Sequence, residues 1–155
     1  MSVADETSER FALRALVDEY ALAVDARDAD RFSGLFAPDG ELVVFEPDED
    51  DPSISWRGPD ELREVMKLLS SYSTTFHLMA NHACELEGDD SASGEVYCLA
   101  HHLTEEEGAT ADNTLMVIRY RDRYTKLDGR WRFLRRDVMR QWTEHHAAER
   151  ARLAV

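Results

Sequence analysis

Two histidines, His77 and His102, could act on one small molecule if residues 74–102 fold back as a β-hairpin. The stretch TTFHLMANHACELEGDDSASGEVYCLAHH consists of two β-rich runs joined by the turn EGDDS. A turn centred between Asp89 and Asp90 places His77 directly opposite His102, on one face of the sheet. Opposed side chains have Cβ atoms about 5 Å apart, so the two imidazoles could hydrogen-bond one substrate oxygen or share a proton.

The assignment of His102 depends on a regular hairpin. The same register pairs His82 with Tyr97 on the opposite parity, and a β-bulge would shift the count by one and substitute His101 for His102. The alternative for either histidine is a half-buried strand residue with a backbone partner and no catalytic role. His101 and His102 therefore both stay open as the histidine that faces a pocket.

Asp25 is the acidic residue best placed to assist a histidine. It follows Val24 at the edge of an apolar helix face, near the predicted C-terminal end of that helix. A carboxylate is unfavourable there because the negative end of the helix dipole lies close by. A histidine from the sheet would compensate the charge, and a carboxylate that orients an imidazole makes it a stronger base. The alternative is an ordinary helix-end aspartate that caps the helix or reaches solvent.

Other kinds of chemistry lack their usual motifs. No HExxH or CxxC spacing indicates a metal site, and no GxxxxGK[ST] or GxGxxG indicates a nucleotide site. Cys84 and Cys98 are too few for a disulfide scaffold and are predicted to be buried free thiols. We therefore expect neither a metal nor a cofactor.

Helical periodicity and β-rich runs follow one another in a clear order. Apolar residues at steps of three and four from Leu13 to Val24 predict one face of an amphipathic helix, which Thr7 or Ser8 could cap, with Glu9 in its first turn. A second helix is predicted in DADRFSGLF, with Asp28 as its N-cap, and a third in RGPDELREVMKLLSS, with Pro59 at its first position. The turn APDG ends the second helix before a short strand at 41–46. The remaining strands are predicted at 74–87, 92–105, 114–127 and 131–142, the last two joined by a type I′ turn at Asp-Gly.

Helices grouped ahead of a long antiparallel meander indicate an α+β architecture. We expect a strongly curved sheet wrapped over the helices, with a pocket on its concave face. The convex face would then expose an apolar patch that includes Tyr97, Leu99, Leu115 and Val117. Patches of this kind usually mark contacts, so a homo-oligomer is predicted, foremost a dimer formed through the sheet.

Length and charge limit the partners. The 155 residues are predicted to form one domain, 1–155, with a core at about 8–142 and a polar tail at 143–155. Acids outnumber bases 32 to 18, which gives a net charge of −14 and argues against nucleic acid or a membrane surface as partner. The N-terminus shows no signal peptide pattern and no run is long enough to span a bilayer, so a cytoplasmic location is expected.

Several segments resemble the SnoaL-like family of the nuclear transport factor 2-like superfamily, which also holds scytalone dehydratase. The segments are VDEYALAVDARDADRFSGLFAPDGEL, WRGPDELREVM, FHLMANHACELEGDDSASGEVYCLAHH and DRYTKLDGRWRFLRRDV, in the family's order and within residues 8–142. The resemblance implies a cone-shaped α+β barrel with a deep apolar pocket. It also implies a small-molecule ligand, although fold alone does not define the reaction.

The resemblance assigns candidate site residues. Scytalone dehydratase uses an aspartate and two histidines, which correspond by resemblance to Asp25, His77 and His102. Two tyrosines that hold water in that enzyme correspond to Val24 and Phe45, neither of which donates a hydrogen bond. Tyr20 is preferred over Tyr97 as a replacement donor, because Tyr97 falls on the opposite strand parity from His102. Pocket walls are expected from Phe36, Phe45, Trp56, Met66, Leu69 and Met79.

These residues together predict a cofactor-free lyase or isomerase, of dehydratase or cyclase type. His77, tuned by Asp25, would remove a proton while His102 polarises an oxygen or protonates a departing hydroxyl. The apolar walls favour flat, partly aromatic or polyketide-like substrates. Two alternatives stay open: a non-catalytic subunit resembling the small subunit of a ring-hydroxylating dioxygenase, and a small-molecule carrier.

Overall fold

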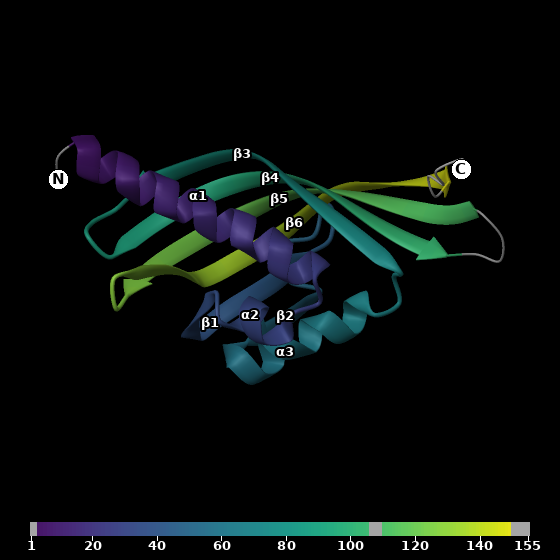
Figure 1. Ribbon diagram of the computed structural model, residues 1–155, viewed down its shortest axis with the longest axis horizontal. Helices are drawn as coiled ribbons and strands as arrows, with labels where there is room; N and C mark the ends of the chain where they lie inside the picture. The colour runs from purple at the N-terminus through teal and green to yellow at the C-terminus, as the bar shows by residue number, and fades with distance from the viewer. Residues whose placement is uncertain (1–2, 106–109, 150–155) are drawn as a thin grey trace, which may run out of the picture.

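Three helices pack on one face of a curved six-stranded sheet in the computed structural model, which describes residues 3–105 and 110–149 (Figure 1). The helices are α1 (Val3–Asp25), α2 (Ala29–Ser33) and α3 (Gly58–Leu69). The strands are β1 (Phe36–Phe45), β2 (Ile54–Arg57), β3 (Thr74–Leu86), β4 (Ser91–Glu105), β5 (Thr110–Leu127) and β6 (Arg130–Glu149). Their order in the sheet is β2-β1-β6-β5-β4-β3, with β1 and β6 parallel and the other neighbours antiparallel. The predicted α+β architecture with a curved sheet over helices is confirmed.

Helix boundaries largely follow the local signals. The predicted cap at Thr7 or Ser8 is wrong, because the first helix begins at Val3 and includes both residues, with Asp5 and Glu6 in its first turn, where acids are favourable. Asp28 caps α2 as predicted, because its side chain accepts a hydrogen bond of 3.0 Å from the Arg31 N–H. Pro59 lies in the first turn of α3, also as predicted.

The APDG segment was wrongly predicted as a turn between the second helix and a strand. It lies inside β1, where the pairing with β6 is irregular between Phe36 and Glu41. Gly40 makes this path possible: a Cβ there would come within 2.9 Å of the carbonyl oxygens of Ala37 and Phe133. The strand therefore bends through the irregularity because the residue at the close approach has no side chain.

The Asp-Gly turn between β5 and β6 has the predicted geometry. Asp128 has φ 51° and Gly129 has φ 74°, and a type I′ turn requires positive φ at both central residues. Beyond Arg130, β6 continues to Glu149 beside β5. Residues 143–149, predicted as part of a polar tail, are therefore strand with mostly exposed side chains, and the end of that predicted tail lies outside the described residues.

The predicted register between β3 and β4 is wrong by two residues. His77 lies opposite Ala100, and His102 lies opposite Thr75. The turn is centred on Asp89, which shifts the count by one, and a bulge shifts it by one more. Because two shifts of one residue preserve the parity, His77 and His102 still share the concave face.

The bulge lies between Met79 and His82, where β3 has one residue more than β4. His82 consequently pairs with Val96 and not with Tyr97. His101 lies opposite Phe76 on the convex face. Of the two histidines left open by the sequence, the structure thus places His102 on the pocket side.

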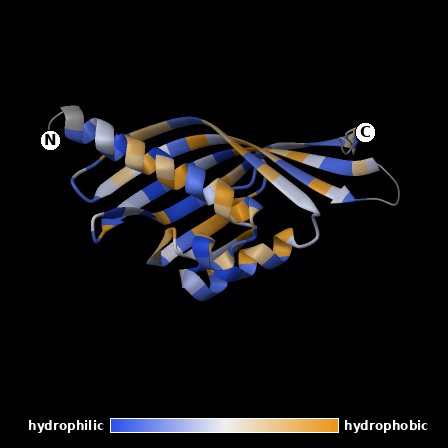
Figure 2. Cartoon of the chain, in the orientation of Figure 1, coloured by the Kyte–Doolittle hydropathy of each residue, from blue (hydrophilic) through white to orange (hydrophobic). Residues whose placement is uncertain are grey.

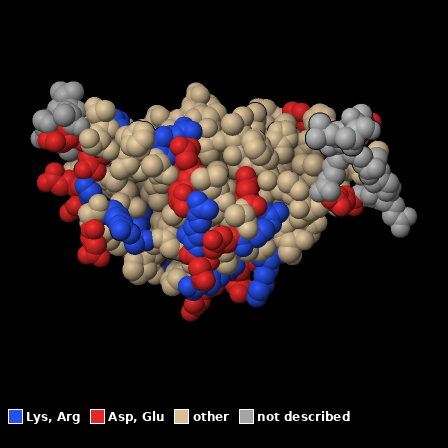
Figure 3. Space-filling view, viewed as in Figure 1, with Lys and Arg blue, Asp and Glu red and all other residues tan. Residues whose placement is uncertain are grey.

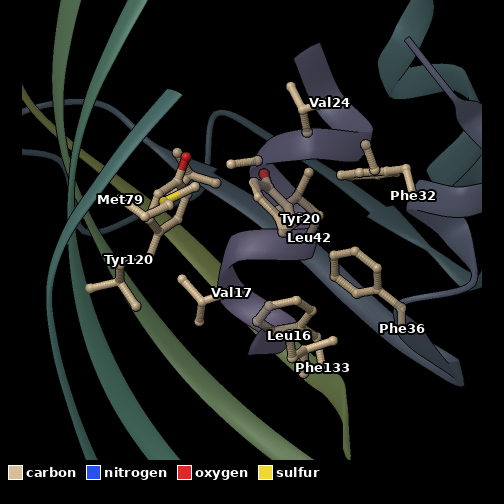
Figure 4. Packing of buried hydrophobic residues seen from close by; sticks show 14 of the residues in the cluster. Leu16, Val17, Tyr20, Val24, Phe32, Phe36, Leu42, Met79, Tyr120 and Phe133 are labelled. Atoms are coloured by element: carbon tan, nitrogen blue, oxygen red, sulfur yellow. The ribbon is translucent and has the colours of Figure 1, made fainter. Parts of the chain in front are cut away.

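The core lies between α1 and the concave face of the sheet (Figure 4). Residues along the strands alternate between hydrophobic and hydrophilic, as expected for a sheet with one buried face (Figure 2). Tyr20 of α1 packs among Phe32, Phe36 and Phe133, with ring centroids 5.3 to 6.5 Å apart. The predicted helix stripe is buried throughout: Leu13, Leu16, Val17, Tyr20 and Val24.

A fully buried ion pair lies beneath α1. Arg136 donates from Nε and Nη2 to the two carboxylate oxygens of Asp122, at 2.8 and 2.7 Å, and neither side chain is exposed. The guanidinium carbon lies 4.1 to 4.3 Å from the ring centroids of Tyr20, Tyr120 and Phe133. Aromatic faces and one carboxylate thus replace the water that the cation loses on folding.

Charged side chains on the helix side join the three helices. In Figure 3 they gather around the N-terminal part of α1 and over α2 and α3, with the two signs interspersed. Arg31 of α2 pairs with Glu19 of α1, and Arg63 of α3 donates to Asp30 of α2 at 2.7 Å. In the described part of the chain, no helix has both the length and the apolar character needed to cross a membrane.

Candidate active site

A cavity of about 310 Å³ lies between the concave face of the sheet and the helices. Both His77 and His102 line it, together with Arg140 and four aromatic side chains that carry a polar atom, Tyr20, Trp56, Tyr72 and Tyr120. The other lining residues are apolar: Val24, Leu42, Val44, Ile54, Val65, Leu68, Leu69, Met116, Ile118 and Val138. A larger, charged hollow of about 640 Å³ lies on the convex face, away from these histidines.

Asp25, the last residue of α1, forms two hydrogen bonds with His77. Its Oδ1 lies 2.7 Å from His77 Nδ1, and its Oδ2 accepts the backbone N–H of His77 at 2.9 Å. A carboxylate only accepts, so Nδ1 carries the proton and Nε2 is the unprotonated nitrogen of the neutral ring. The His77 side chain is 6% exposed, which shields this hydrogen bond from competing water. The ring can therefore accept a proton at Nε2 while Asp25 stabilises the resulting cation.

Two further residues fix the carboxylate. The Thr75 hydroxyl donates to Asp25 Oδ1 at 2.8 Å, and it accepts from Arg27 Nη1 at 2.6 Å. Arg27 follows α1 with φ 57° and also donates to the Val24 carbonyl at 3.0 Å, which ties it to the end of the helix. Burial alone would raise the pKa of Asp25, but the hydrogen bonds from His77 and Thr75 outweigh it and hold the pKa below its ordinary value.

His102 is buried beside His77, with ring centroids 5.5 Å apart. Its Nδ1 lies 3.2 Å from the Ala100 carbonyl, so Nδ1 carries the proton and Nε2 is the acceptor. Burial and the neighbouring His77 lower the pKa of His102 to about 4, against the opposing effect of backbone carbonyls. A ring in this state has no spare proton near neutral pH, so the expected role of His102 as proton donor does not fit its environment.

This lowered pKa predicts a pH dependence of stability. Between about pH 6.5 and 4 the unfolded chain protonates His102 and the folded chain does not, so the free energy of unfolding falls as the pH falls. We expect about 3 kcal/mol of stability to be lost from this residue between pH 7 and pH 4. Urea unfolding of wild type and His102→Gln across this range measures it. Equal pH dependence in the two proteins would contradict the prediction.

Three of the seven expected substrate-binding residues line the cavity. Trp56 and Leu69 line the cavity, and so does Tyr20. Phe36 and Met79 do not line it; both are buried in the hydrophobic core.

Met66 and Phe45 were also wrongly expected to line the cavity. Met66 instead borders a second hollow of about 390 Å³, which Asp25 and Tyr72 also line. Phe45 follows Val44 in β1, and since successive strand side chains point to opposite faces, Val44 and not Phe45 reaches the cavity.

Sequence reasoning missed four residues of the site. Thr75 precedes His77 by two residues, so strand periodicity could have placed it on the same face. Arg27 and Tyr72 reach the site from loops and Arg140 from the middle of β6, which no local pattern indicates. No group of three or more His, Cys, Asp or Glu residues suited to a metal ion occurs within the described ranges. Cys98 is buried and Cys84 half-buried, and both are free.

The fold and the site define a class of small α+β proteins in which a curved sheet and helices enclose an apolar cavity next to an aspartate–histidine pair. The chain matches the SnoaL-like domain family over residues 5–137, and it belongs to this family, within the nuclear transport factor 2-like superfamily. The predicted family is therefore confirmed.

Solved structures show the same fold. A variant of Rv3472, described as a protein of unknown function from Mycobacterium tuberculosis, is 26% identical with a TM-score of 0.75, over 91% of this chain and 77% of that one. A type 2 hexachlorocyclohexane dehydrochlorinase (LinA) is 21% identical with a TM-score of 0.81, over 99% and 100% of the chains. A putative scytalone dehydratase from Novosphingobium aromaticivorans is 19% identical with a TM-score of 0.80, over 99% of each chain. Comparison with curated protein sequences finds no match.

Proposed function

We propose that this protein is a cofactor-free lyase or isomerase that removes a proton from carbon in a small, largely apolar substrate. The observation that carries the proposal is the hydrogen bond of 2.7 Å between Asp25 and His77 Nδ1, with His77 lining an apolar cavity. Structures of the same fold that are described as a dehydrochlorinase and a putative dehydratase support this reaction class.

In this mechanism His77 is the base and Asp25 its positioning residue. Nε2 of His77 takes a proton from carbon, the C–H electron pair becomes a new C=C bond, and the neighbouring bond to the leaving group breaks with its electrons on that group. Asp25 does not line the cavity, so it acts through His77 by holding the proton on Nδ1 and stabilising the imidazolium. The apolar walls exclude water that would otherwise compete for the base.

The cavity limits the substrate. A volume of about 310 Å³ is at the lower end of the range for small-molecule sites and suits a molecule of one or two rings. The only Lys or Arg side chain along the cavity, within the described residues, is Arg140, and its Nη1 is already bonded to both carboxylate oxygens of Glu46 at 2.9 and 3.2 Å. A neutral, flat substrate therefore fits better than an anionic one.

Turnover of a small panel tests the proposal. The panel contains scytalone, hexachlorocyclohexane and a benzylic β-hydroxy ketone, each assayed for the elimination product by chromatography. We expect wild type to convert at least one compound and His77→Gln to lose that conversion. Binding of these compounds without any turnover would support the carrier alternative, and full turnover by His77→Gln would contradict the proposed base.

We also propose that the protein forms a dimer through the convex face of the sheet. Leu78, Leu99, Val117 and Trp142 lie side by side across β3, β4, β5 and β6 as one apolar row. Leu78 is 49% and Trp142 52% exposed. The same face carries charges of both signs, so a second copy turned about a two-fold axis could place opposite charges together as it buries the row.

Light scattering at micromolar concentration tests the dimer. We expect twice the chain mass of 17.8 kDa for wild type, and the mass of a monomer for Leu99→Asp, which puts a charge in the row. Leu127→Asp is the matched control, because Leu127 is equally exposed but lies at the end of β5, outside the row. A monomeric wild type would contradict the proposal.

A further inference from the structure

The proposed elimination leaves one role unfilled, the donor to the atom that gains negative charge. Both imidazoles already donate a hydrogen bond through their only ring proton: His77 Nδ1 donates to Asp25, and His102 Nδ1 donates to the Ala100 carbonyl. Each neutral ring therefore offers only an acceptor at Nε2. A leaving hydroxide needs a proton, because hydroxide itself departs poorly, so the cavity must supply a donor from another side chain.

Most other donors along the cavity are engaged or remote from the histidines. The hydroxyls of Tyr20 and Tyr120 interact with each other, and Tyr120 also interacts with the Cys98 thiol. Arg140 is held by Glu46. Trp56 carries an indole N–H, which does not give up its proton, and the structure gives it no ring contact with either histidine.

Tyr72 differs from all of these. It lies between α3 and β3, where its backbone N–H donates to the Leu69 carbonyl at 3.1 Å. Its ring centroid is 4.8 Å from that of His102, and the side chain is half-buried. Among the described residues, its hydroxyl has no hydrogen-bond partner. It lines both the main cavity, which His77 also lines, and the second hollow, which Asp25 and Arg27 border. The phenol therefore lies between the cavity and the Asp25–His77 pair.

We propose that Tyr72 is the proton donor of this site and that the substrate leaves an oxygen group, as in a β-hydroxy carbonyl compound. The inference rests on the proposed function. As His77 Nε2 takes the carbon-bound proton and the C=C bond forms, the C–O bond breaks with its electron pair on oxygen. The Tyr72 proton passes to that oxygen and water leaves. The phenolate then regains a proton from the His77 imidazolium through solvent, which restores both groups.

Tyr72→Phe tests the donor, because it keeps the ring against His102 and removes only the hydroxyl. The turnover arm compares a benzylic β-hydroxy ketone with its β-chloro counterpart, since chloride leaves without a proton. We expect the variant to lose about 100-fold or more in kcat on the hydroxy compound and less than about threefold on the chloro compound. Tyr97→Phe, on the convex face, is the control and should change neither. An equal loss on both compounds, or no loss on either, would overturn the proposal.

A binding arm separates this proposal from the proposed function. Acetophenone and α-methylstyrene have the same shape, but only acetophenone has an oxygen that accepts a hydrogen bond. NMR titration should show that Tyr72→Phe weakens acetophenone several-fold to about tenfold and leaves α-methylstyrene unchanged, as expected for one lost hydrogen bond. An unchanged ratio of the two affinities would overturn the donor role. If His77→Gln keeps full turnover while Tyr72→Phe shifts the ratio of the two affinities, His77 is not the base but Tyr72 remains the donor.

Discussion

Asp25→Asn is expected to lower kcat by a factor of about 10²–10⁴ and to leave the fold intact, because correct orientation and charge on a base are worth that much. An asparagine can still fill the space, but its amide carries no charge to stabilise the His77 imidazolium. Its NH₂ group can also face Nδ1, which would move the ring proton to Nε2 and remove the base from the cavity. KM should change little, because Asp25 does not line the cavity.

Asp18→Asn is the matched control for this prediction. Asp18 lies on the same helix and pairs with Arg14 at an exposed site, so its charge is lost without any effect on His77. Steady-state kinetics on the panel compound that wild type converts, with circular dichroism to check folding, give the comparison. A kcat within twofold of wild type for Asp25→Asn would mean that the carboxylate does not tune the base.

Asp122→Asn is expected to destabilise the protein by about 3–5 kcal/mol, the largest effect on stability that the structure predicts. The substitution leaves the Arg136 guanidinium with no counter-charge in a site where neither side chain is exposed. The amide also keeps only one acceptor oxygen for the three hydrogen bonds that Asp122 accepts, two from Arg136 and one of 2.7 Å from Tyr124. The cost is large because the cation cannot reach water without opening the packing between α1 and the sheet.

Urea unfolding of Asp122→Asn and Asp30→Asn separates burial from pairing. Asp30 also pairs with an arginine, Arg63, but its side chain is 84% exposed, so the loss should stay within about 1 kcal/mol. If the free energy of unfolding falls by the same small amount in both variants, the Asp122–Arg136 pair does not stabilise the fold as much as its burial indicates.

The parts of the fold that depend on local pattern could be predicted from the sequence. The stripe from Leu13 to Val24 identifies the buried face of α1 because helical periodicity is a local property. The pairing of β3 with β4 also follows from local pattern. Its exact register depends on a bulge between Met79 and His82, which cannot be predicted from the residue types there. His77 and His102 still share a face only because the register shifts twice by one residue; a single shift would have placed them on opposite faces.

The remaining features depend on contacts between distant segments. The short edge strand β2 was not predicted, because Ile54 and its neighbours are mostly exposed and the strand exists through its pairing with β1. The Asp122–Arg136 pair and the position of Tyr72 are likewise set by neighbouring strands and by the path of a loop. Such features have no periodic signature, so the cavity walls were predicted less well than the core.

The protonation pattern of His77 tests the central claim most directly, because it needs no substrate. Nitrogen NMR of labelled protein, at a pH where the ring is neutral, distinguishes a proton on Nδ1 from one on Nε2. The account predicts that the proton is on Nδ1 in wild type, held by the Asp25 carboxylate at 2.7 Å, and that Asp25→Asn loses this preference. A neutral His77 that carries its proton on Nε2 in wild type would contradict the account, since that ring would have no base to offer the cavity.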